Sequence, residues 1–120
     1  MDIEYFRDYC LSKNGATESF PFDDKVLVFK VKNKIFALAN IVDFESINLK
    51  CEPIKALELR AEYDEVKPGY HMNKQHWNTV HVKERLNLSL ITELIDHSYN
   101  LVVASLSNKL KNELRAKERK

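Results

Sequence analysis

The segment KPGYHMNKQHW, residues 67–77, gathers most of the side chains that could contact a ligand. It supplies two histidines, two lysines and an asparagine beside the rings of Tyr70 and Trp77. Flat rings interleaved with hydrogen-bond donors could stack a nucleobase and contact phosphate. The same rings could instead pin the loop to the edge of the domain while its polar groups bond locally, because Tyr and Trp usually bury most of their area. The sequence is compatible with both interpretations.

Three histidines, His71, His76 and His81, raise the question of a metal site. Their spacing of five and five residues matches neither the i, i+4 helical pair nor the tight pairs of structural zinc sites. In an extended strand, a separation of five also places successive side chains on opposite faces. The pattern therefore favours solvated or locally bonded histidines, and it predicts no metal and no cofactor. His97, beside Asp96 on a predicted helix, is expected to be an ordinary surface histidine.

Motifs of nucleophilic, metal-dependent or phosphate-cradling enzymes are absent from the sequence. It contains no GxSxG, HExxH or CxxC, and its two glycines cannot form a glycine-rich phosphate loop. Glu18, Asp23 and Asp24 lie beside a predicted turn, where acids are usually solvated or cap backbone groups. Cys51 has only Lys50 beside it to lower the pKa of its thiol, so a nucleophilic role is not expected. The sequence predicts a protein that is not an enzyme.

The charges divide unevenly along the chain. Residues 109–120 carry six Lys or Arg and two Glu, which gives +4, whereas residues 1–108 carry 13 basic and 16 acidic groups, which gives −3. A dedicated nucleic-acid-binding domain usually shows a basic surface. Any contact with a polyanion is therefore expected to come from a local patch or from the basic C-terminal extension.

Length and composition indicate one folded domain. The chain has 120 residues, of which 44% are hydrophobic, enough for one core but not for two. Cys10 and Cys51 are far apart and fit no metal-binding spacing, so two free thiols in a reducing compartment are expected. The first residues carry acids rather than a basic run, and no apolar stretch approaches the roughly 20 residues that span a bilayer. We therefore expect a cytoplasmic protein with no membrane contact.

The elements that must position these groups follow from hydrophobic periodicity. Residues 2–13 predict an amphipathic helix that stops at the Asn-Gly pair after it. Residues 26–31 and 35–41 predict an antiparallel hairpin, with Asn33 at positive φ in its turn. Alternation in SINLK, residues 46–50, predicts a third strand of the same sheet.

A second helix is predicted to start at Pro53, which suits the first turn of a helix. Ile54, Leu57 and Ala61 fall on one stripe, which is expected to be its buried face. The helix is expected to end before Pro68.

The second half of the chain continues with a turn, a strand and a helix. Pro68 and Gly69 predict a type II turn in which the glycine takes positive φ. Residues 77–82 alternate as a late strand, and the periodicity from Ser89 onward predicts the longest helix, which must cover the sheet. The order α-β-β-β-α-β-α predicts an α+β fold of two layers, a mainly antiparallel sheet packed by helices.

Five sequence blocks stand out in order along the chain. They are GATESFPF (15–22), VFKVKNKIFAL (28–38), INLKCEP (47–53), VKPGYHMNKQHWNTV (66–80) and LIDHSYNLVV (94–103). In combination these blocks resemble the MmcQ/YjbR family of small bacterial proteins. The resemblance extends from about residue 3 to residue 106. We therefore expect one MmcQ/YjbR-like domain over residues 1–106 and a basic C-terminal extension over residues 107–120.

The resemblance implies a compact YjbR-like α+β fold and a DNA-binding function in which two hairpin-like projections act as wings, a double-wing arrangement. The matching projections here are the 32–34 turn with its lysines and the 67–77 segment. The candidate nucleic-acid-binding residues are Lys30, Lys32, Lys34, Lys67, Tyr70, His71, Asn73, Lys74, His76 and Trp77. One edge-strand lysine most often only faces solvent, but the lysines grouped on one face would form a positive strip.

A different class of function is a non-catalytic binding module for a small molecule or a protein. In this hypothesis the ESFPF loop and the 67–77 segment wall a pocket. The walls and polar anchors would come from Phe20, Phe22, Tyr70 and Trp77, with His76 or Glu18. The two hypotheses differ in salt dependence, because phosphate contacts weaken steeply as salt rises and an apolar pocket keeps its ligand.

Overall fold

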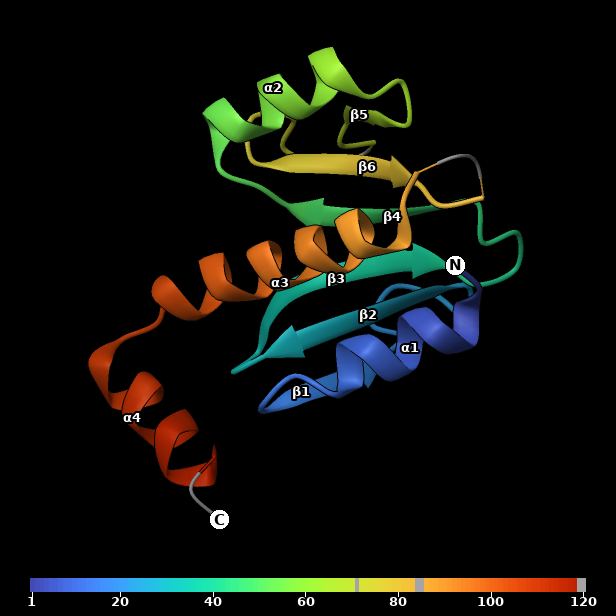
Figure 1. Ribbon diagram of the computed structural model, residues 1–120. Helices are drawn as coiled ribbons and strands as arrows, with labels where there is room; N and C mark the ends of the chain where they lie inside the picture. Colours follow the sequence, from blue (N-terminus) through green and yellow to red (C-terminus); the bar gives the residue numbers. More distant parts are fainter. Residues whose placement is uncertain (71, 84–85, 119–120) are drawn as a thin grey trace.

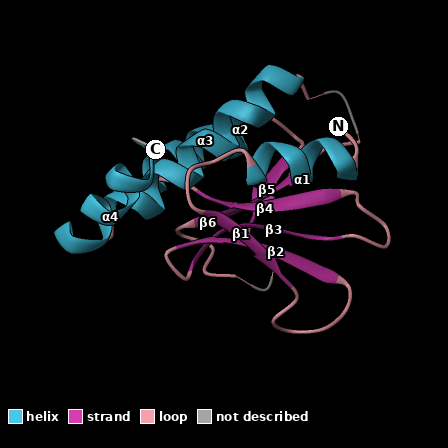
Figure 2. Ribbon diagram, turned by 90° about the horizontal axis from the view of Figure 1, so that it is seen from below, coloured by secondary structure: helices cyan, strands magenta, loops and turns pink. Residues whose placement is uncertain are grey.

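The computed structural model describes residues 1–70, 72–83 and 86–118. Within these residues the chain forms a six-stranded sheet and four helices, and the helices lie on one side of the sheet (Figures 1 and 2). The strand order is β1-β2-β3-β4-β6-β5, and all neighbours are antiparallel. The predicted fold class, a two-layer α+β fold with an antiparallel sheet, is confirmed.

The predicted order of elements was incomplete. In chain order the elements are α1 (Ile3–Leu11), β1 (Ala16–Ser19), β2 (Val26–Val31), β3 (Lys34–Asn40), β4 (Ser46–Lys50), α2 (Pro53–Glu62), β5 (Val66–Pro68), β6 (Trp77–His81), α3 (Leu88–Ala104) and α4 (Asn108–Glu118). The prediction lacked β1, β5 and α4. The two strands are short edge strands of four and three residues, too short to show alternation. Helix α4 is mostly charged, so few apolar positions mark its period.

Alternation along the strands gives the sheet two distinct faces. Leu27, Phe29 and Val31 of β2 are buried on the face toward the helices, as their alternation predicted. Phe6 of α1 packs edge-on against Phe29, with ring centroids 5.3 Å apart. Helix α3 lies across β2, β3 and β4. The core therefore sits between the sheet and these two helices.

Two predicted chain reversals occur where the sequence placed them. The turn between β2 and β3 has Lys32 and Asn33 at positive φ, 48° and 68°, which matches the right-handed twist of a tight hairpin. After α1 the chain turns at Gly15, with φ of 75°. A Cβ atom at Gly15 would lie 2.6 Å from Leu114 Cδ2. Glycine is therefore favoured there by the positive φ, and a larger residue would also displace the Leu114 side chain.

The predicted buried stripe of α2 was wrong. Ile54 and Leu57 are 67% and 63% exposed, and Ala61 is exposed as well. The buried residues of this helix are Ala56 and Leu59. Helix α2 lies near the β5 edge of the sheet, where only a narrow stripe of the helix can be covered. Periodicity identified a helix but could not determine which of two apolar stripes faces the sheet.

A serine of α3 completes the pairing of β3 with β4. The ladder contains Ala37 opposite Leu49, and one further step of the same register would pair Phe36 with Lys50. Instead, the backbone N–H of Lys50 donates to Ser98 Oγ at 2.8 Å, and that hydroxyl donates to Phe36 O at 2.5 Å. Ser98 is fully buried. Its hydroxyl therefore replaces a missing ladder hydrogen bond and joins α3 to both strands.

The start of α2 contacts a histidine of α3. His97 Nε2 accepts a hydrogen bond from the backbone N–H of Glu52 at 3.2 Å, and the Glu52 carboxylate caps the N–H groups of Ile54 and Lys55. Burial lowers the pKa of His97, which keeps the ring neutral and able to accept. The expectation of an ordinary surface histidine was therefore wrong, because the N-cap residue of α2 contacts this side of α3.

The stability of the protein is expected to fall as the pH decreases through the titration range of His97. The unfolded chain has the ordinary histidine pKa of about 6.5, above the folded value, so protonation favours unfolding. The contribution is complete above about pH 6.5 and is lost as the pH falls toward the folded pKa. Urea denaturation at about pH 7.5 and about pH 5.5 should give a lower midpoint at the acidic pH. The decrease should be smaller in His97→Gln, and equal decreases would contradict the assignment.

Both cysteines are free thiols inside the core, as predicted. Burial raises the pKa of Cys10 and of Cys51, so both thiols are protonated near neutral pH. Over residues 1–70, 72–83 and 86–118, no helix combines the length and the apolar character needed to cross a bilayer. In the same ranges, no three His, Cys, Asp or Glu side chains are grouped to hold a metal ion.

Candidate functional site

The strand residues on the face of the sheet opposite the helices, called here the open face, include lysines and no carboxylates. The register directs Lys30 of β2, Lys50 of β4 and Lys67 of β5 to this face. Every strand residue lies in the described part of the chain, and among them Glu18 is the only Asp or Glu. Glu18 points to the helical side, where its carboxylate pairs with Arg7 Nε at 2.9 Å. The strand positions of the open face are therefore purely basic or neutral.

A cleft of about 450 Å³ opens on this face. Its walls come from the loop before β2 and the loop before β6, and its floor comes from β2, β3, β4 and β6. The residues that matter most are Phe22, Tyr70, Met72, Leu38, Asn48 and Thr79. Phe22 and Tyr70 are 67% and 68% exposed. Exposed rings that line a cleft together can contact a ligand, so the cleft is the main candidate ligand site.

The floor of the cleft offers hydrogen-bond donors to a ligand. Thr79 Oγ1 donates to Asn48 Oδ1 at 2.5 Å and accepts from the backbone N–H of Tyr70 at 2.9 Å. Asn40 Oδ1 accepts from the N–H of Val42 at 2.9 Å. Among the described residues, no hydrogen bond uses the amide nitrogen of Asn40 or of Asn48. Both amide groups therefore keep their N–H donors for a ligand.

The loop between β5 and β6 is largely held by its own polar groups. Asn73 Oδ1 accepts from the backbone N–H groups of Gln75 and His76, at 2.9 and 3.3 Å. Lys74 Nζ donates to Gly69 O at 3.0 Å. Asn73 and Lys74 were predicted as ligand contacts, and in the structure they serve the conformation of the loop. The expectation that polar groups here bond locally therefore describes these two residues.

An arginine of α2 fixes the other end of this loop. Arg60 Nε donates to Asn78 Oδ1 at 2.7 Å, and Nη2 donates to Trp77 O at 3.2 Å. Nη2 also bonds Lys74 O. The guanidinium group therefore connects α2 to β6 and to the loop that carries Tyr70.

The predicted type II turn at Pro68 and Gly69 was wrong. Gly69 does not have positive φ. Pro68 is the last residue of β5, and the N–H of Gly69 continues the ladder by donating to Trp77 O at 2.8 Å. A Cβ atom at Gly69 would lie 2.8 Å from Trp77 Cβ and 2.9 Å from Trp77 O. Glycine is therefore needed for close approach of the two strands rather than for a left-handed backbone.

The three hairpin lysines do not share one face. Lys30 belongs to the open face, whereas Lys32 pairs with Glu113 of α4 at 2.8 Å. Lys34 Nζ lies 3.5 Å from Ser105 Oγ at the end of α3. The pairing with Lys32 lowers the pKa of Glu113. The structure therefore separates Lys32 and Lys34 from Lys30.

The remaining candidate residues, in and beside the loop between β5 and β6, differ in exposure and in the surface they reach. Lys67 and Trp77 lie on the open face, Lys67 exposed and Trp77 half-buried. His76 is half-buried, and its carbonyl accepts the backbone N–H of Cys51 at 2.8 Å. His71 lies outside the described residues. Tyr70 is the candidate that reaches the cleft.

Sequence reasoning missed Lys50 and the floor of the cleft. The alternation in SINLK buries Ile47 and Leu49, and the same alternation places Asn48 and Lys50 on the opposite face. That signal was present but was read only for the core. No sequence signal places Leu38 beside Asn48, because their pairing depends on the register of β3 and β4.

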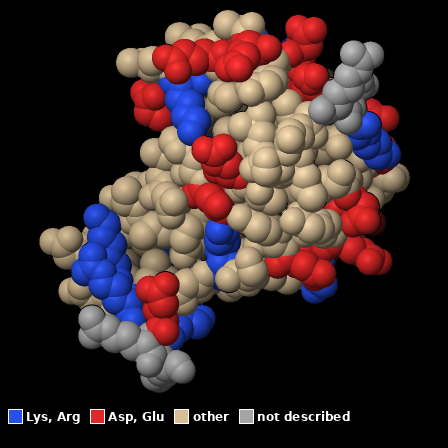
Figure 3. Space-filling model, viewed as in Figure 1, with Lys and Arg blue, Asp and Glu red and all other residues tan. Residues whose placement is uncertain are grey.

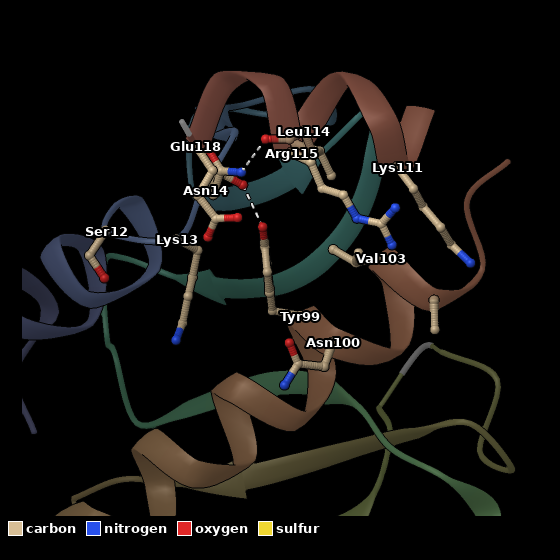
Figure 4. A pocket seen from close by; sticks show the side chains of 11 residues that line it. Ser12, Lys13, Asn14, Tyr99, Asn100, Val103, Lys111, Leu114, Arg115 and Glu118 are labelled. Atoms are coloured by element: carbon tan, nitrogen blue, oxygen red, sulfur yellow. Dashed lines mark hydrogen bonds between the residues drawn. The ribbon is translucent and has the colours of Figure 1, made fainter. Parts of the chain in front are cut away.

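A second cleft lies between α3, α4 and the end of α1 (Figure 4). Tyr99 OH donates to Asn14 O at 2.5 Å, and Asn14 Nδ2 donates to Leu114 O at 2.8 Å. Leu114 is buried. These polar groups hold α4 against the domain, so this cleft serves as a joint between elements. Residues 108–118, predicted as part of a basic extension, form a helix that contacts the segment after α1 and the turn between β2 and β3.

The helical side of the molecule carries charges of both signs (Figure 3). Acidic side chains gather over α2, at the top of the view, and basic side chains gather over α4, at the lower left. The basic residues of α4 are Lys109, Lys111, Arg115 and Lys117. This mixture contrasts with the strand positions of the open face, where lysines occur without acids.

Comparison with known proteins places the chain in a family. A family model described as YjbR matches residues 11–101. The chain belongs to the YjbR family. The uncharacterized protein YbdF of Escherichia coli O157:H7 is 40% identical to it over 97 residues, 80% of each chain. The uncharacterized protein YjbR of Escherichia coli strain K12 is 36% identical over 104 residues, 86% of this chain and 88% of that protein.

Solved structures of other proteins share this fold. The crystal structure of Deinococcus radiodurans protein DR2400, described as a DUF419 domain, superposes with a TM-score of 0.89 and 36% identity, over 94% of this chain and 87% of that chain. A crystal structure of a Pseudomonas syringae protein gives a TM-score of 0.72 and 29% identity, over 84% of this chain and 98% of that chain. The similarity extends through most of the chain, so the arrangement of the sheet and its helices is shared with these structures.

The blocks that carry the YjbR resemblance have clear structural roles here. GATESFPF supplies Gly15, which admits α4, and Phe22, which walls the cleft. The PGYHMNK block supplies Gly69, which allows β5 to approach β6. The HSY sequence supplies Ser98 and Tyr99, which tie α3 to the strands and to the end of α1. These blocks therefore supply contacts that hold the fold, and the first of them also supplies a wall of the cleft.

Proposed function

We propose that this YjbR-family protein binds DNA through the open face of its sheet, without catalysis and in the cytoplasm. One observation carries the proposal: the strand positions of that face include Lys30, Lys50 and Lys67 and contain no carboxylate. Lysines contribute to DNA affinity by neutralising phosphates and releasing counterions. Strand positions with lysines and no acids give this part of the surface a local positive charge that would attract a polyanion, even though residues 1–108 of the chain are net negative.

The spacing of the lysines suits a nucleic-acid backbone. Lys30 and Lys67 lie on β2 and β5, with β3, β4 and β6 between them. Four strand spacings separate them by roughly 20 Å, since neighbouring strands are about 4.8 Å apart. Lys50 lies on β4, between the two. The three side chains therefore form a row long enough to contact several consecutive phosphates.

The proposal modifies the double-wing arrangement that the family resemblance implies. Of the two projections, the 67–77 segment borders the open face through Lys67 and Tyr70. The 32–34 turn contacts α4 through the ion pair of Lys32 with Glu113. Lys30 is the lysine of this hairpin that lies on the open face. We therefore assign the phosphate contacts to the sheet surface rather than to the tip of the hairpin.

Salt dependence tests the proposed DNA binding. Fluorescence anisotropy with a labelled 15-base-pair duplex should give a dissociation constant that rises steeply with NaCl. For about three neutralised phosphates, the slope of the logarithm of the association constant against the logarithm of the salt concentration should be about −2.7. Absence of binding to both this duplex and a single strand of the same length at about 20 mM NaCl would rule out the proposal, and a slope near zero would rule out its electrostatic basis.

The cleft favours a second candidate function, the binding of a small molecule. Its volume of about 450 Å³ falls in the range of ligand pockets, and Phe22 and Tyr70 line it as that hypothesis expected. The cleft is not lined by the other walls and anchors of that hypothesis, which were Phe20, Trp77, His76 and Glu18. A ligand held mainly by these rings would remain bound at high salt. Thermal-shift measurements with a metabolite panel at about 50 and about 500 mM NaCl would detect such a ligand.

A further inference from the structure

We propose that the open-face cleft accepts one unpaired nucleobase, so that the preferred ligand is a single-stranded nucleic acid rather than a duplex. This inference rests on the proposed function and specifies its ligand. The cleft lies among the lysines of the open face, beside Asn48 and Thr79. Duplex bases are stacked and paired, so only an unpaired base can enter a cleft of this kind.

The walls of the cleft suit a flat ring. Phe22 and Tyr70 come from two separate loops and both line the cleft, and each exposes about two thirds of its surface. Leu38 and Val26 form apolar floor between them. Aromatic side chains that receive a base by stacking are a common device of single-strand binders, because every base has a π-face. The exposure of both rings is then explained, since a stacked base would cover them.

The floor of the cleft suits the edge of a base. The carbonyl oxygens of Asn40 and Asn48 already accept hydrogen bonds from Val42 and Thr79, whereas no hydrogen bond among the described residues uses their amide nitrogens. What these two side chains offer a ligand is therefore N–H donors. Amide donors pair with carbonyl oxygens and ring nitrogens of bases. Adenine carries an exocyclic amino donor that would face these amide donors unfavourably, whereas thymine presents two carbonyl oxygens and no amino group, so we expect thymine to be bound better than adenine. The polarity of the floor thus gives the cleft a preference that stacking alone would not provide.

The phosphates next to an inserted base would lie within reach of the lysines. Thr79 of the cleft floor pairs with Lys67 on one side and with Asn48 on the other. Lys50 is two residues from Asn48 on the same strand, which is about 7 Å. Lys67 is two strand spacings from Asn48, which is about 10 Å. A lysine side chain spans several ångströms, so both ammonium groups can meet the strand beside the cleft.

Binding of single-stranded and duplex probes by the full chain tests the inference. Labelled dT15, labelled dA15 and the dA15–dT15 duplex would be titrated by anisotropy at about 50 mM NaCl. We expect dT15 to bind at least about tenfold more tightly than the duplex and more tightly than dA15. The double variant Phe22→Ala, Tyr70→Ala should lose about tenfold or more in affinity for dT15 while its affinity for the duplex stays within about twofold.

Phe20→Ala is the matched control for the cleft variant. Phe20 is in the same loop as Phe22 and is 45% exposed, but it does not line the cleft. Its substitution should leave dT15 binding within about twofold of the unmodified protein. Thermal melts of all variants would verify folding, which surface substitutions of this kind should preserve.

Each other outcome separates the two proposals. Equal affinity for dT15 and duplex, with no effect of the cleft variant, would overturn the inference and leave DNA binding standing. No binding of any probe would overturn both. Displacement of dT15 by an equal concentration of thymidine monophosphate would show a site for free nucleotides and overturn the assignment to a strand.

Discussion

The affinity for DNA is expected to fall about 100-fold or more when Lys30, Lys50 and Lys67 are all replaced by glutamate. Each substitution removes a phosphate contact with its released counterion and adds a repulsive charge, so the losses act in the same direction. Anisotropy at about 50 mM NaCl would measure the loss. The salt slope should approach zero at the same time, because no phosphate contact remains on the open face.

The control for this variant lies on the opposite side of the molecule. Replacement of Lys109, Lys111 and Lys117 on α4 by glutamate changes the net charge by the same amount on a surface that is already of mixed sign (Figure 3). Binding should change far less than in the open-face variant. If the α4 variant lost its affinity and the open-face variant kept it, the polyanion would be bound by the C-terminal helix, and the proposed interface would be wrong.

The free energy of unfolding is expected to fall by about 2–4 kcal/mol in Ser98→Ala. The hydroxyl accepts from the N–H of Lys50 and donates to Phe36 O. Its loss leaves two buried backbone groups unsatisfied, and each costs about 1–3 kcal/mol. Since the register of β3 and β4 places no other partner at this point, the strands cannot repair the gap without moving. Urea denaturation followed by circular dichroism would measure the change.

Ser105→Ala provides the matched control on the same helix. Ser105 Oγ donates to Val102 O at 2.6 Å, but Ser105 is an exposed residue at the end of α3. Water can replace this hydrogen bond, so a cost below about 1 kcal/mol is expected. Similar costs for the two substitutions would show that Ser98 contributes only an ordinary hydrogen bond.

Local patterns predicted the elements whose residues repeat clearly. Alternation in VLVFKV and SINLK gave two central strands and their buried faces, because burial on one side selects every second residue. The tight turn after Val31 followed from Asn33, which tolerates positive φ. The pattern failed at α2, where Ile54 and Leu57 are apolar yet exposed. The spacing of apolar residues in this helix does not determine which of its sides is covered by the sheet.

The candidate site was predicted only in part for a related reason. The sequence indicated that rings and donors gather at residues 67–77, but Asn73 and Lys74 turned out to bond within the loop. Lys32 and Lys34 are only two and four residues from Lys30, yet they contact the helices on the other side of the sheet. Lys32 contacts α4, and Lys34 contacts the end of α3. Such contacts depend on helices far along the chain, which no short segment can specify.

The sequence by itself determined the family, the α+β class, the strands of the centre and the residues available for binding. Those properties are local, since they depend on periodicity, turn residues and the order of short blocks. The tertiary structure alone decided that Phe22 and Tyr70, 48 positions apart in the sequence, wall one cleft. It also decided that Lys30, Lys50 and Lys67 share one face. These properties require strand register and helix packing, which bring distant residues together through pairing across the whole sheet.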